Sequence, residues 1–316
     1  MSTEAPRSSA DQLSLQAWSL LILLGVIWGG SFFFGRIAVS EMPPLVLVMF
    51  RVTIAALVLQ LWLLARGPSF RLALPMAAQF FALAVLNNII PFSLIFLGQT
   101  ELGAGIAAVL NATTPFWTVV LANMLTSDEK LSWAKVLGIG FGIAGTCVMI
   151  GPGLVAGLGG PIWAKLALVG AAVSYAFAFI FARRFRGVPP PVIATGQLTA
   201  SSIIMVPLIL MTYSPHGLFA ASAGVWAAVL ALAVLATSFA YILYFRIIAL
   251  AGATNASLVT LIVPVTAVLL GALFLGERLH VFEIAGMALI ALGLITIDGR
   301  FFRLLRGHPP TLVNTK

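Results

Sequence analysis

Charged side chains are scarce in this sequence. Only 8% of its 316 residues are Asp, Glu, Lys or Arg, whereas 61% are hydrophobic, and the mean hydropathy is +1.11. Soluble domains carry about 25% charged residues, so this chain has too little polar surface to face water and must face lipid. Its richness in Leu, Ala, Gly and Phe favours spanning helices over a barrel, whose strands would alternate apolar and polar residues.

Cysteine is almost absent as well. Cys147 stands alone in an apolar run, which excludes an intramolecular disulfide and indicates a packing residue. The formal net charge of +8 could indicate a nucleic-acid partner, but the basic residues fall in short loops, where they set membrane topology instead. We expect the lipid bilayer and a small-molecule substrate as partners, and no nucleic acid; the sequence is compatible with a monomer.

The chain also lacks the motifs of common catalytic sites. It contains no HExxH, GxSxG or Walker A pattern, so we predict no enzyme activity, no catalytic residues, no metal and no cofactor. No Asp, Glu, Lys or His lies near the expected midplane of a span. A proton-coupled carrier usually keeps a titratable group within the membrane, so this absence favours facilitated or weakly coupled transport.

Ten apolar segments approach the roughly 20 residues that a helix needs to cross the hydrocarbon core. The connections between them are short and leave no room for a soluble domain. Residues 1–17 are expected to form a cytoplasmic N-terminal segment and residues 299–316 a basic cytoplasmic tail. The predicted spans are residues 18–39, 44–65, 72–97, 102–125, 132–151, 162–182, 190–213, 223–246, 252–275 and 280–298.

The distribution of Lys and Arg predicts the orientation. With a cytoplasmic N-terminus, the outer side holds only Arg36, Lys165 and Arg278, and most of the other basic residues lie on the inner side. Basic residues concentrate in cytoplasmic loops. We therefore expect both termini of this multi-pass protein in the cytoplasm.

The word ALAVL occurs at residues 82–86 and again at residues 231–235. The same register is kept, with small shifts in the loops, across five segments, which indicates duplication of a five-helix unit at residues 18–151 and 162–298. Because five is odd, the second copy enters the membrane from the opposite side. The matching features include Gly103 and Gly252, Pro115 and Pro264, Gly138 and Gly286, Gly145 and Gly293, and Glu129-Lys130-Leu131 and Glu277-Arg278-Leu279.

Inverted repeats are typical of alternating-access transporters, whose substrate site lies near the midplane where the halves meet. The sequence therefore predicts an all-α integral membrane protein of ten transmembrane helices, built as two inverted five-helix repeats. A channel would instead favour rings of like residues around a pore axis.

Several stretches carry a family resemblance over nearly the whole chain. They are GVIWGGSFFFGRIA at residues 25–38, MFRVTIAAL at 49–57, and the two related blocks that begin ELGAGIAAVLNATTPFW at 101 and LAGATNASLVTLIVPV at 250. The chain resembles the EamA-type ten-helix exporters of the drug/metabolite transporter superfamily. This resemblance implies export of amino acids, metabolites or drugs across a bacterial inner membrane. We expect aromatic or neutral amino acids and related hydrophobic compounds; the alternatives are a multidrug or nucleotide-sugar-type carrier of this superfamily, or a channel.

Three prolines follow polar residues in the middle of spans. Pro91, Pro115 and Pro264 each deprive the carbonyl four residues earlier of its usual donor. Either nearby polar side chains satisfy these kinks, or the kinks line the central cavity and act as hinges; the two interpretations are compatible. The freed carbonyls are those of Asn87, Asn111 and Thr260.

Polar and aromatic residues near these kinks are the candidates for the substrate cavity, although an aromatic stripe can equally face lipid or pack in the core. Arg51 lies about two turns into its span. It would either reach outward to the interface and loop carbonyls or serve as a gate contact or an anchor for a substrate carboxylate. The cavity candidates are Trp28, Ser31, Phe32, Asn87, Asn88, Asn111, Thr114, Trp117, Ser174, Tyr175, Phe177, Ser238, Tyr241, Tyr244, Asn255 and Thr260.

Overall fold

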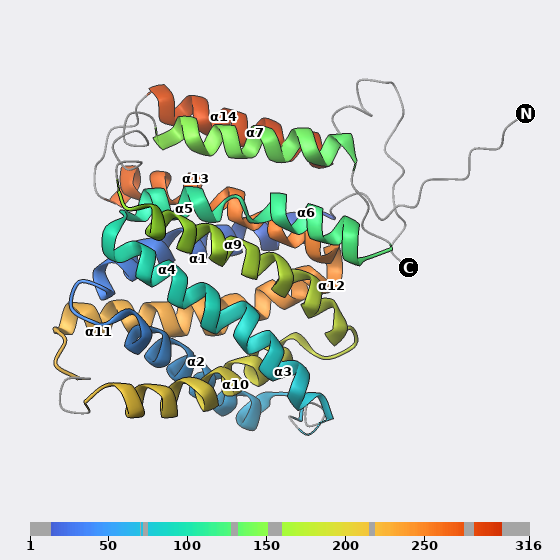
Figure 1. Cartoon of the computed structure of the whole chain (residues 1–316). Coiled ribbons are helices and arrows are strands. Elements are labelled where there is room, and N and C mark those ends of the chain that lie inside the picture. Colours follow the sequence, from blue (N-terminus) through green and yellow to red (C-terminus); the bar gives the residue numbers. More distant parts are fainter. Residues whose placement is uncertain are drawn as a thin grey trace, which may run out of the picture.

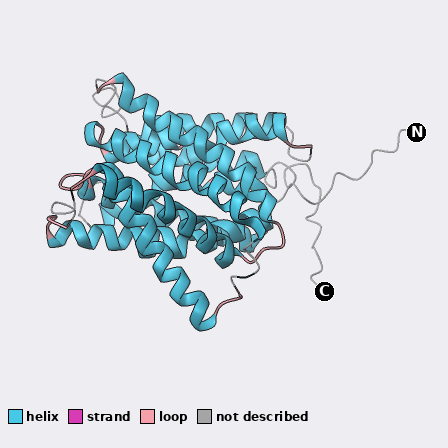
Figure 2. Ribbon diagram, turned by 60° about the horizontal axis from the view of Figure 1, so that its bottom comes forward, coloured by secondary structure: helices cyan, strands magenta, loops and turns pink. Residues whose placement is uncertain are grey.

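The computed structural model describes residues 14–69, 71, 75–127, 132–150, 160–214, 219–274 and 281–298. Within these ranges the chain is helical and contains no strand (Figure 2). The predicted N-terminal segment up to residue 13, the tail from residue 299 and both Glu-basic-Leu motifs lie outside the described residues.

The first half forms five spans, two of which are interrupted. Span 1 is α1 and span 2 is α2, whereas span 3 combines two α-helices around a π-helix, and span 4 is broken at Ala112 and Thr113. The elements are α1 (Leu15–Ala38), α2 (Pro44–Arg66), α3 (Ala77–Ala84), η3 (Val85–Ile89), α4 (Ile90–Glu101), α5 (Ala104–Asn111), α6 (Thr114–Leu125) and α7 (Trp133–Ile150).

The second half repeats this plan. Span 8 again combines α-helices around a π-helix, and it ends at Gly252, whose φ of 82° favours glycine and turns the chain into span 9. The elements are α9 (Ile162–Ala182), η4 (Arg183–Phe185), α10 (Pro190–Thr212), α11 (Ala223–Leu230), η6 (Ala231–Phe239), α12 (Ala240–Ser257), α13 (Val259–Phe274) and α14 (Val281–Asp298).

These elements confirm the predicted fold of ten helices in two repeats. Seven of the described helices are long and apolar enough to cross a membrane, and α7 and α14 contribute shorter apolar helices. Two predicted boundaries need correction. Span 3 has its first α-helix from Ala77 instead of residue 72, and span 8 continues past residue 246 until Gly252 interrupts it.

The packing of the two halves follows the inverted symmetry. Span 1 packs against span 9 through α1 and α13, and its counterpart span 6 packs against span 4 through α9, α5 and α6. Spans 2 and 7 pair through α2 and α10, and spans 5 and 10 pair through α7 and α14 at one edge of the bundle (Figure 1). The outer pairs therefore enclose a core in which spans 1, 3, 4, 6, 8 and 9 meet.

Repeat-related glycines bring α7 and α14 together. A Cβ atom added at Gly145 would lie 2.7 Å from the carbonyl oxygen of Gly286 and 2.8 Å from the backbone nitrogen of Ile290. Small residues allow this close approach of two helices in a membrane, where van der Waals packing drives association. The contacts cross between the two predicted pairs, because Gly145 faces Gly286 and Gly138 faces Gly293.

The repeated word ALAVL overlaps a π-helix in each half. In the first half η3 covers Val85–Ile89, and in the second half η6 covers Ala231–Phe239. Hydroxyl groups follow the same wide spacing, because Thr237 donates to the carbonyl of Leu232 at 2.7 Å and Ser238 donates to that of Ala233 at 2.9 Å. Such π-segments are frequent at functional sites, and both lie in the core between the halves.

Candidate functional site

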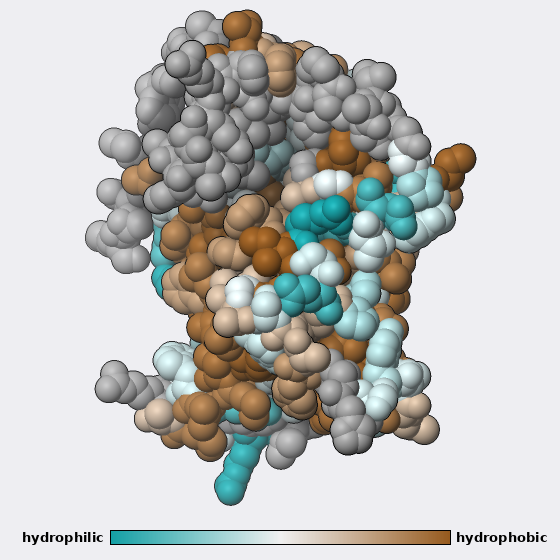
Figure 3. Space-filling model, turned by 90° about the vertical axis from the view of Figure 1, so that its left-hand side faces the viewer, coloured by the Kyte–Doolittle hydropathy of each residue, from teal (hydrophilic) through white to brown (hydrophobic). Residues whose placement is uncertain are grey.

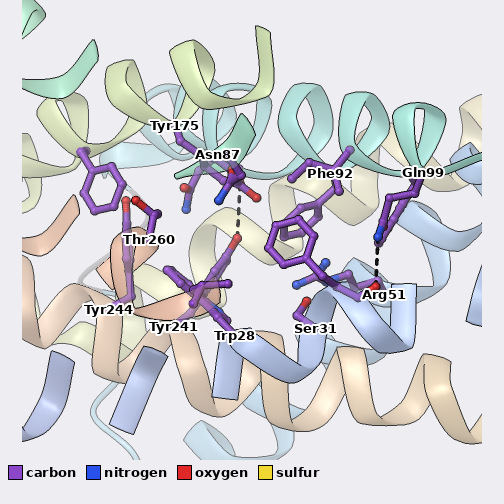
Figure 4. Close-up of a pocket in the computed structure, with 16 residues that line it drawn as sticks. Trp28, Ser31, Arg51, Asn87, Phe92, Gln99, Tyr175, Tyr241, Tyr244 and Thr260 are labelled. Carbon is purple, nitrogen blue, oxygen red and sulfur yellow. Dashed lines mark hydrogen bonds between the residues drawn. The ribbon is translucent and has the colours of Figure 1, made fainter. Parts of the chain in front are cut away.

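A cavity of about 610 Å³, open space at its mouth included, lies between the two halves. Residues of spans 1, 2, 3, 4, 6, 8 and 9 line it (Figure 4), so it forms where the inverted repeats meet. Its lining consists of Trp28, Ser31, Phe32, Arg51, Asn87, Phe92, Ile95, Phe96, Gln99, Asn111, Tyr175, Phe179, Tyr241, Tyr244, Thr260 and Val263.

Arg51 is the charged residue of this lining. Its side chain is 5% exposed, and its Nε donates to the hydroxyl of Thr237 in η6 at 2.8 Å. The guanidinium carbon lies 3.8 Å above the centre of the Phe92 ring and 5.8 Å from that of Phe96. Its second hydrogen bond, from Nη2 to the carbonyl of Ala236, is long at 3.5 Å. Arg51 therefore points into the protein, which contradicts the interpretation that it reaches outward to loop carbonyls.

A network of neutral polar groups joins spans 3, 7 and 8 beside the cavity. The hydroxyl of Tyr241 donates to Oδ1 of Asn88 at 2.6 Å and lies 3.2 Å from the carbonyl oxygen of Asn87 (Figure 4). The amide of Asn87 donates to Oε1 of Gln197 at 3.0 Å, and that of Asn88 donates to the hydroxyl of Ser201 at 2.8 Å. These buried bonds tie the first half to the second at the level of η3.

The two π-helices each receive a hydrogen bond from the opposite half. Ser174 of span 6 donates to the carbonyl of Leu86 in η3 at 2.7 Å, and Trp28 of span 1 donates through Nε1 to the carbonyl of Ala236 in η6 at 3.1 Å. In the wide register of η3, the carbonyl of Leu86 is the one that the missing N–H of Pro91 would leave free. Side chains from the other half therefore satisfy the kink, as the first interpretation predicts.

Aromatic rings close the end of the cavity around Tyr244. Its ring centre lies 5.8 Å from that of Trp28, 5.1 Å from that of Phe179 and 5.8 Å from that of Tyr241. Figure 4 places Tyr244 and Thr260 at one end of the cavity and Arg51, Ser31 and Gln99 at the other. The cavity is thus cationic at one end and aromatic at the other.

Three polar atoms of the lining have no hydrogen-bond partner within the described chain. They are Oε1 of Gln99, Oδ1 of Asn111 and the hydroxyl of Tyr244, and all three side chains are at most 5% exposed. A buried polar group without a partner costs about 1–3 kcal/mol. Such groups in a cavity are therefore available to a bound molecule or to water.

The end of the bundle at the α1–α2 turn carries a further contact between the halves. Glu41, in the turn between α1 and α2, accepts hydrogen bonds from the backbone nitrogen and the hydroxyl of Ser222 at 2.7 and 2.8 Å. These bonds hold the pKa of the Glu41 carboxyl below its usual value. Figure 3 shows this end of the molecule, where polar side chains lie among apolar ones.

Comparison with known proteins decides the family. A family model described as the EamA-like transporter family matches residues 16–151 and 162–297, so each five-helix half of the chain is matched once. The chain belongs to the EamA-like transporter family. This confirms the resemblance to drug/metabolite transporters.

Several relatives carry transporter names. The uncharacterized inner membrane transporter YedA of Escherichia coli K12 is 29% identical over 299 residues, which cover 91% of this chain and 93% of that protein. The uncharacterized transporter YoaV of Bacillus subtilis is 23% identical over 290 residues, covering 90% of this chain and 97% of that protein. A solved structure, described only as "Crystal structure of protein", covers 91% of this chain and 99% of its own with a TM-score of 0.71 at 20% identity, which supports the EamA-like fold.

Within this EamA-like frame, the structure brings together ten of the residues singled out in the sequence. Nine of them project from the core spans, and Arg51 reaches the cavity from span 2. These residues are Trp28, Ser31, Phe32, Arg51, Asn87, Asn111, Tyr175, Tyr241, Tyr244 and Thr260.

Phe177 lies outside the cavity. It is 39% exposed on the surface of α9, whereas Tyr175 and Phe179 line the cavity. At 100° per residue, Phe177 lies 200° around the helix from both of them. Its expected place in the lining is therefore wrong.

The other candidates lie in the bundle outside the cavity lining, and all of them except Trp117 have a described hydrogen bond there. Asn88 and Ser174 hold the inter-half bonds described above, Thr114 donates to the carbonyl of Asn111 at 2.6 Å, and Ser238 donates to backbone carbonyls. Asn255 donates to the carbonyl of Ala251 at 3.0 Å, and Trp117 packs edge-on against Phe116. The bonds of Thr114 and Asn255 stay within their own span, those of Asn88 and Ser174 join the halves, and Nε1 of Trp117 has no partner within the described chain. The sequence pattern did not separate these roles from cavity lining.

Two of the three kink prolines follow an interruption of a core span, and the third lies within a helix. Pro91 lies in the first turn of α4 after η3, Pro115 lies in the first turn of α6 after the break at Ala112, and Pro264 lies inside α13.

The sequence did not predict six residues of the lining. One of them, Gln99, lies beyond the predicted end of its span. The missed residues are Phe92, Ile95, Phe96, Gln99, Phe179 and Val263.

Proposed function

We propose that this EamA-like membrane transporter exports small metabolites from a bacterial cytoplasm, with aromatic or neutral amino acids and related hydrophobic compounds as the main substrates. The observation that carries the proposal is the aromatic and modestly polar cavity between the inverted halves. A neutral aromatic side chain would stack against Trp28, Tyr244 and Phe179, and the polar groups of the lining would bond the rest of the molecule.

The proposed mechanism is alternating access. The halves would rock about the shared network of spans 3, 7 and 8, with Pro91, Pro115 and Pro264 as hinges, and expose the cavity to each side in turn. The residues of the lining would act as the substrate-binding residues. We propose that the protein is a monomer in the inner membrane. The distribution of basic residues supports a cytoplasmic position for both termini.

A ligand screen tests the proposed substrates. A molecule that binds only the folded protein raises its melting temperature, so aromatic and neutral amino acids should raise the Tm of the purified transporter and support counterflow in proteoliposomes. Amphipathic cations serve as the comparison. Stabilisation and counterflow by the cations alone would favour a multidrug carrier and contradict amino-acid export.

A further inference from the structure

The guanidinium of Arg51 lies in a cavity whose described lining contains no Asp or Glu. Its described contacts are a hydroxyl, a backbone carbonyl and two aromatic rings, all of them neutral. A buried charge is costly unless an opposite charge accompanies it. Among the described residues, the protein supplies no such counter-charge at this point.

The orientation of Arg51 leaves the Nη edge of its guanidinium available to a ligand. Nε is used by Thr237, the ring of Phe92 covers one face of the guanidinium, and Nη1 donates to no atom of the described chain. The two Nη atoms form the planar fork that binds a carboxylate through two parallel hydrogen bonds. This part of the side chain faces a cavity, not solvent at the membrane surface.

We propose that Arg51 is the carboxylate-binding residue of the cavity, and that the site takes amphipathic monocarboxylates, whether or not they also carry an ammonium group. The carboxylate lies at the end near Gln99 and Ser31, and the hydrophobic body lies against the packed rings of Trp28 and Tyr244 (Figure 4). The proposal rests on the proposed transport function and narrows its substrates to compounds with a single carboxylate. An ammonium group is accommodated by the free Oδ1 of Asn111 but is not required.

Three related compounds test this with the unaltered transporter. Phenylalanine carries both charged groups, 3-phenylpropanoate only the carboxylate, and 2-phenylethylamine only the ammonium. We expect the first two to raise the Tm of the purified protein and to exchange in proteoliposomes, and the amine to do neither. Because this comparison needs no variant, it stays decisive even where substitution of Arg51 impairs folding.

Variants of Arg51 then assign the effect to the residue. Arg51→Gln should weaken binding of both carboxylates by about 10- to 100-fold, the contribution of hydrogen bonds to a charged group. Arg51→Lys keeps the charge but loses the planar fork, so its affinity for both carboxylates should lie between those of the unaltered protein and Arg51→Gln. Arg246→Gln is the matched control, since Arg246 is exposed on α12 and lies outside the cavity lining, and it should bind both carboxylates as the unaltered protein does.

The outcomes separate the inference from the proposed function. Binding of the amine as tight as that of the carboxylates, binding of none of the three, or carboxylate binding unchanged in Arg51→Gln overturns the inference. Carboxylate binding that depends on Arg51 without any flux supports the site and overturns export. Binding and exchange that both depend on Arg51 support both.

Discussion

Tyr241 and Tyr244 are adjacent on one face of α12, yet their hydroxyl groups have different surroundings. That of Tyr241 bonds Asn88 at 2.6 Å, whereas that of Tyr244 has no partner within the described chain. Both rings are 2% exposed. The pair therefore allows a buried hydroxyl with a hydrogen-bond partner to be compared with one that has no described partner.

Removing the two hydroxyl groups should have unequal effects on stability. Tyr241→Phe leaves Oδ1 of Asn88 buried without its donor, which should cost about 1–3 kcal/mol in the free energy of unfolding. Tyr244→Phe removes a hydroxyl that lacks a described partner and should change stability by less than about 0.5 kcal/mol. Thermal unfolding of the two purified variants measures the difference. Equal losses would show that the hydrogen bond from Tyr241 to Asn88 contributes no more to stability than the unpartnered hydroxyl of Tyr244 does.

At the scale of residues, the sequence predicts polar members of the cavity better than apolar ones. Asn87 and Tyr241 stand out because a polar group inside a membrane needs a partner. Phe92 and Phe179 do not stand out, since a phenylalanine in a spanning helix looks the same whether it faces lipid, core or cavity. Only the rotation of each helix in the bundle separates these cases, as the 200° between Phe177 and its lining neighbours shows.

At the scale of elements, the spans follow from hydropathy, but their interruptions do not. Hydropathy predicted ten segments, and the repeat register predicted which helices correspond. The π-helices η3 and η6 begin within the shared word ALAVL, yet nothing in the composition distinguishes a wide helical turn from an ordinary one. Their backbone spacing depends on contacts such as those of Ser174 and Trp28, which come from the opposite half.

The glycines of α7 offer a test of helix pairing. Gly145→Ala would place a methyl group against the backbone of α14, at 2.7 Å from the carbonyl oxygen of Gly286. We expect a loss of about 1–3 kcal/mol from this overpacking. Gly140 has no atom within 4 Å of an added Cβ, so Gly140→Ala should be neutral or stabilise the helix by up to about 1 kcal/mol.

Urea or thermal unfolding of the two glycine variants in the same detergent gives the comparison. The two positions lie in one helix and undergo the same substitution, so helix propensity affects both alike. Gly145→Ala as stable as Gly140→Ala would mean that α7 and α14 do not pack as closely as the structure shows.

At the scale of the whole molecule, the inverted symmetry is only approximate at the cavity. Arg51 in span 2 and Gln197 in span 7 occupy repeat-related positions, but one is cationic and lines the cavity, whereas the other is neutral and accepts a hydrogen bond from Asn87. The repeated sequence predicts the frame of the transporter. The residues at which the copies diverge determine the charge of the cavity and hence the substrates that it can hold.

Alternating access between the two halves is the central claim, and exchange across a membrane tests it most directly. Efflux of labelled phenylalanine from proteoliposomes should saturate with concentration and should speed up when unlabelled phenylalanine is present outside, because a loaded cavity returns with substrate instead of empty. An efflux that rises linearly with concentration and does not respond to substrate on the other side would contradict alternating access and indicate a continuous pore.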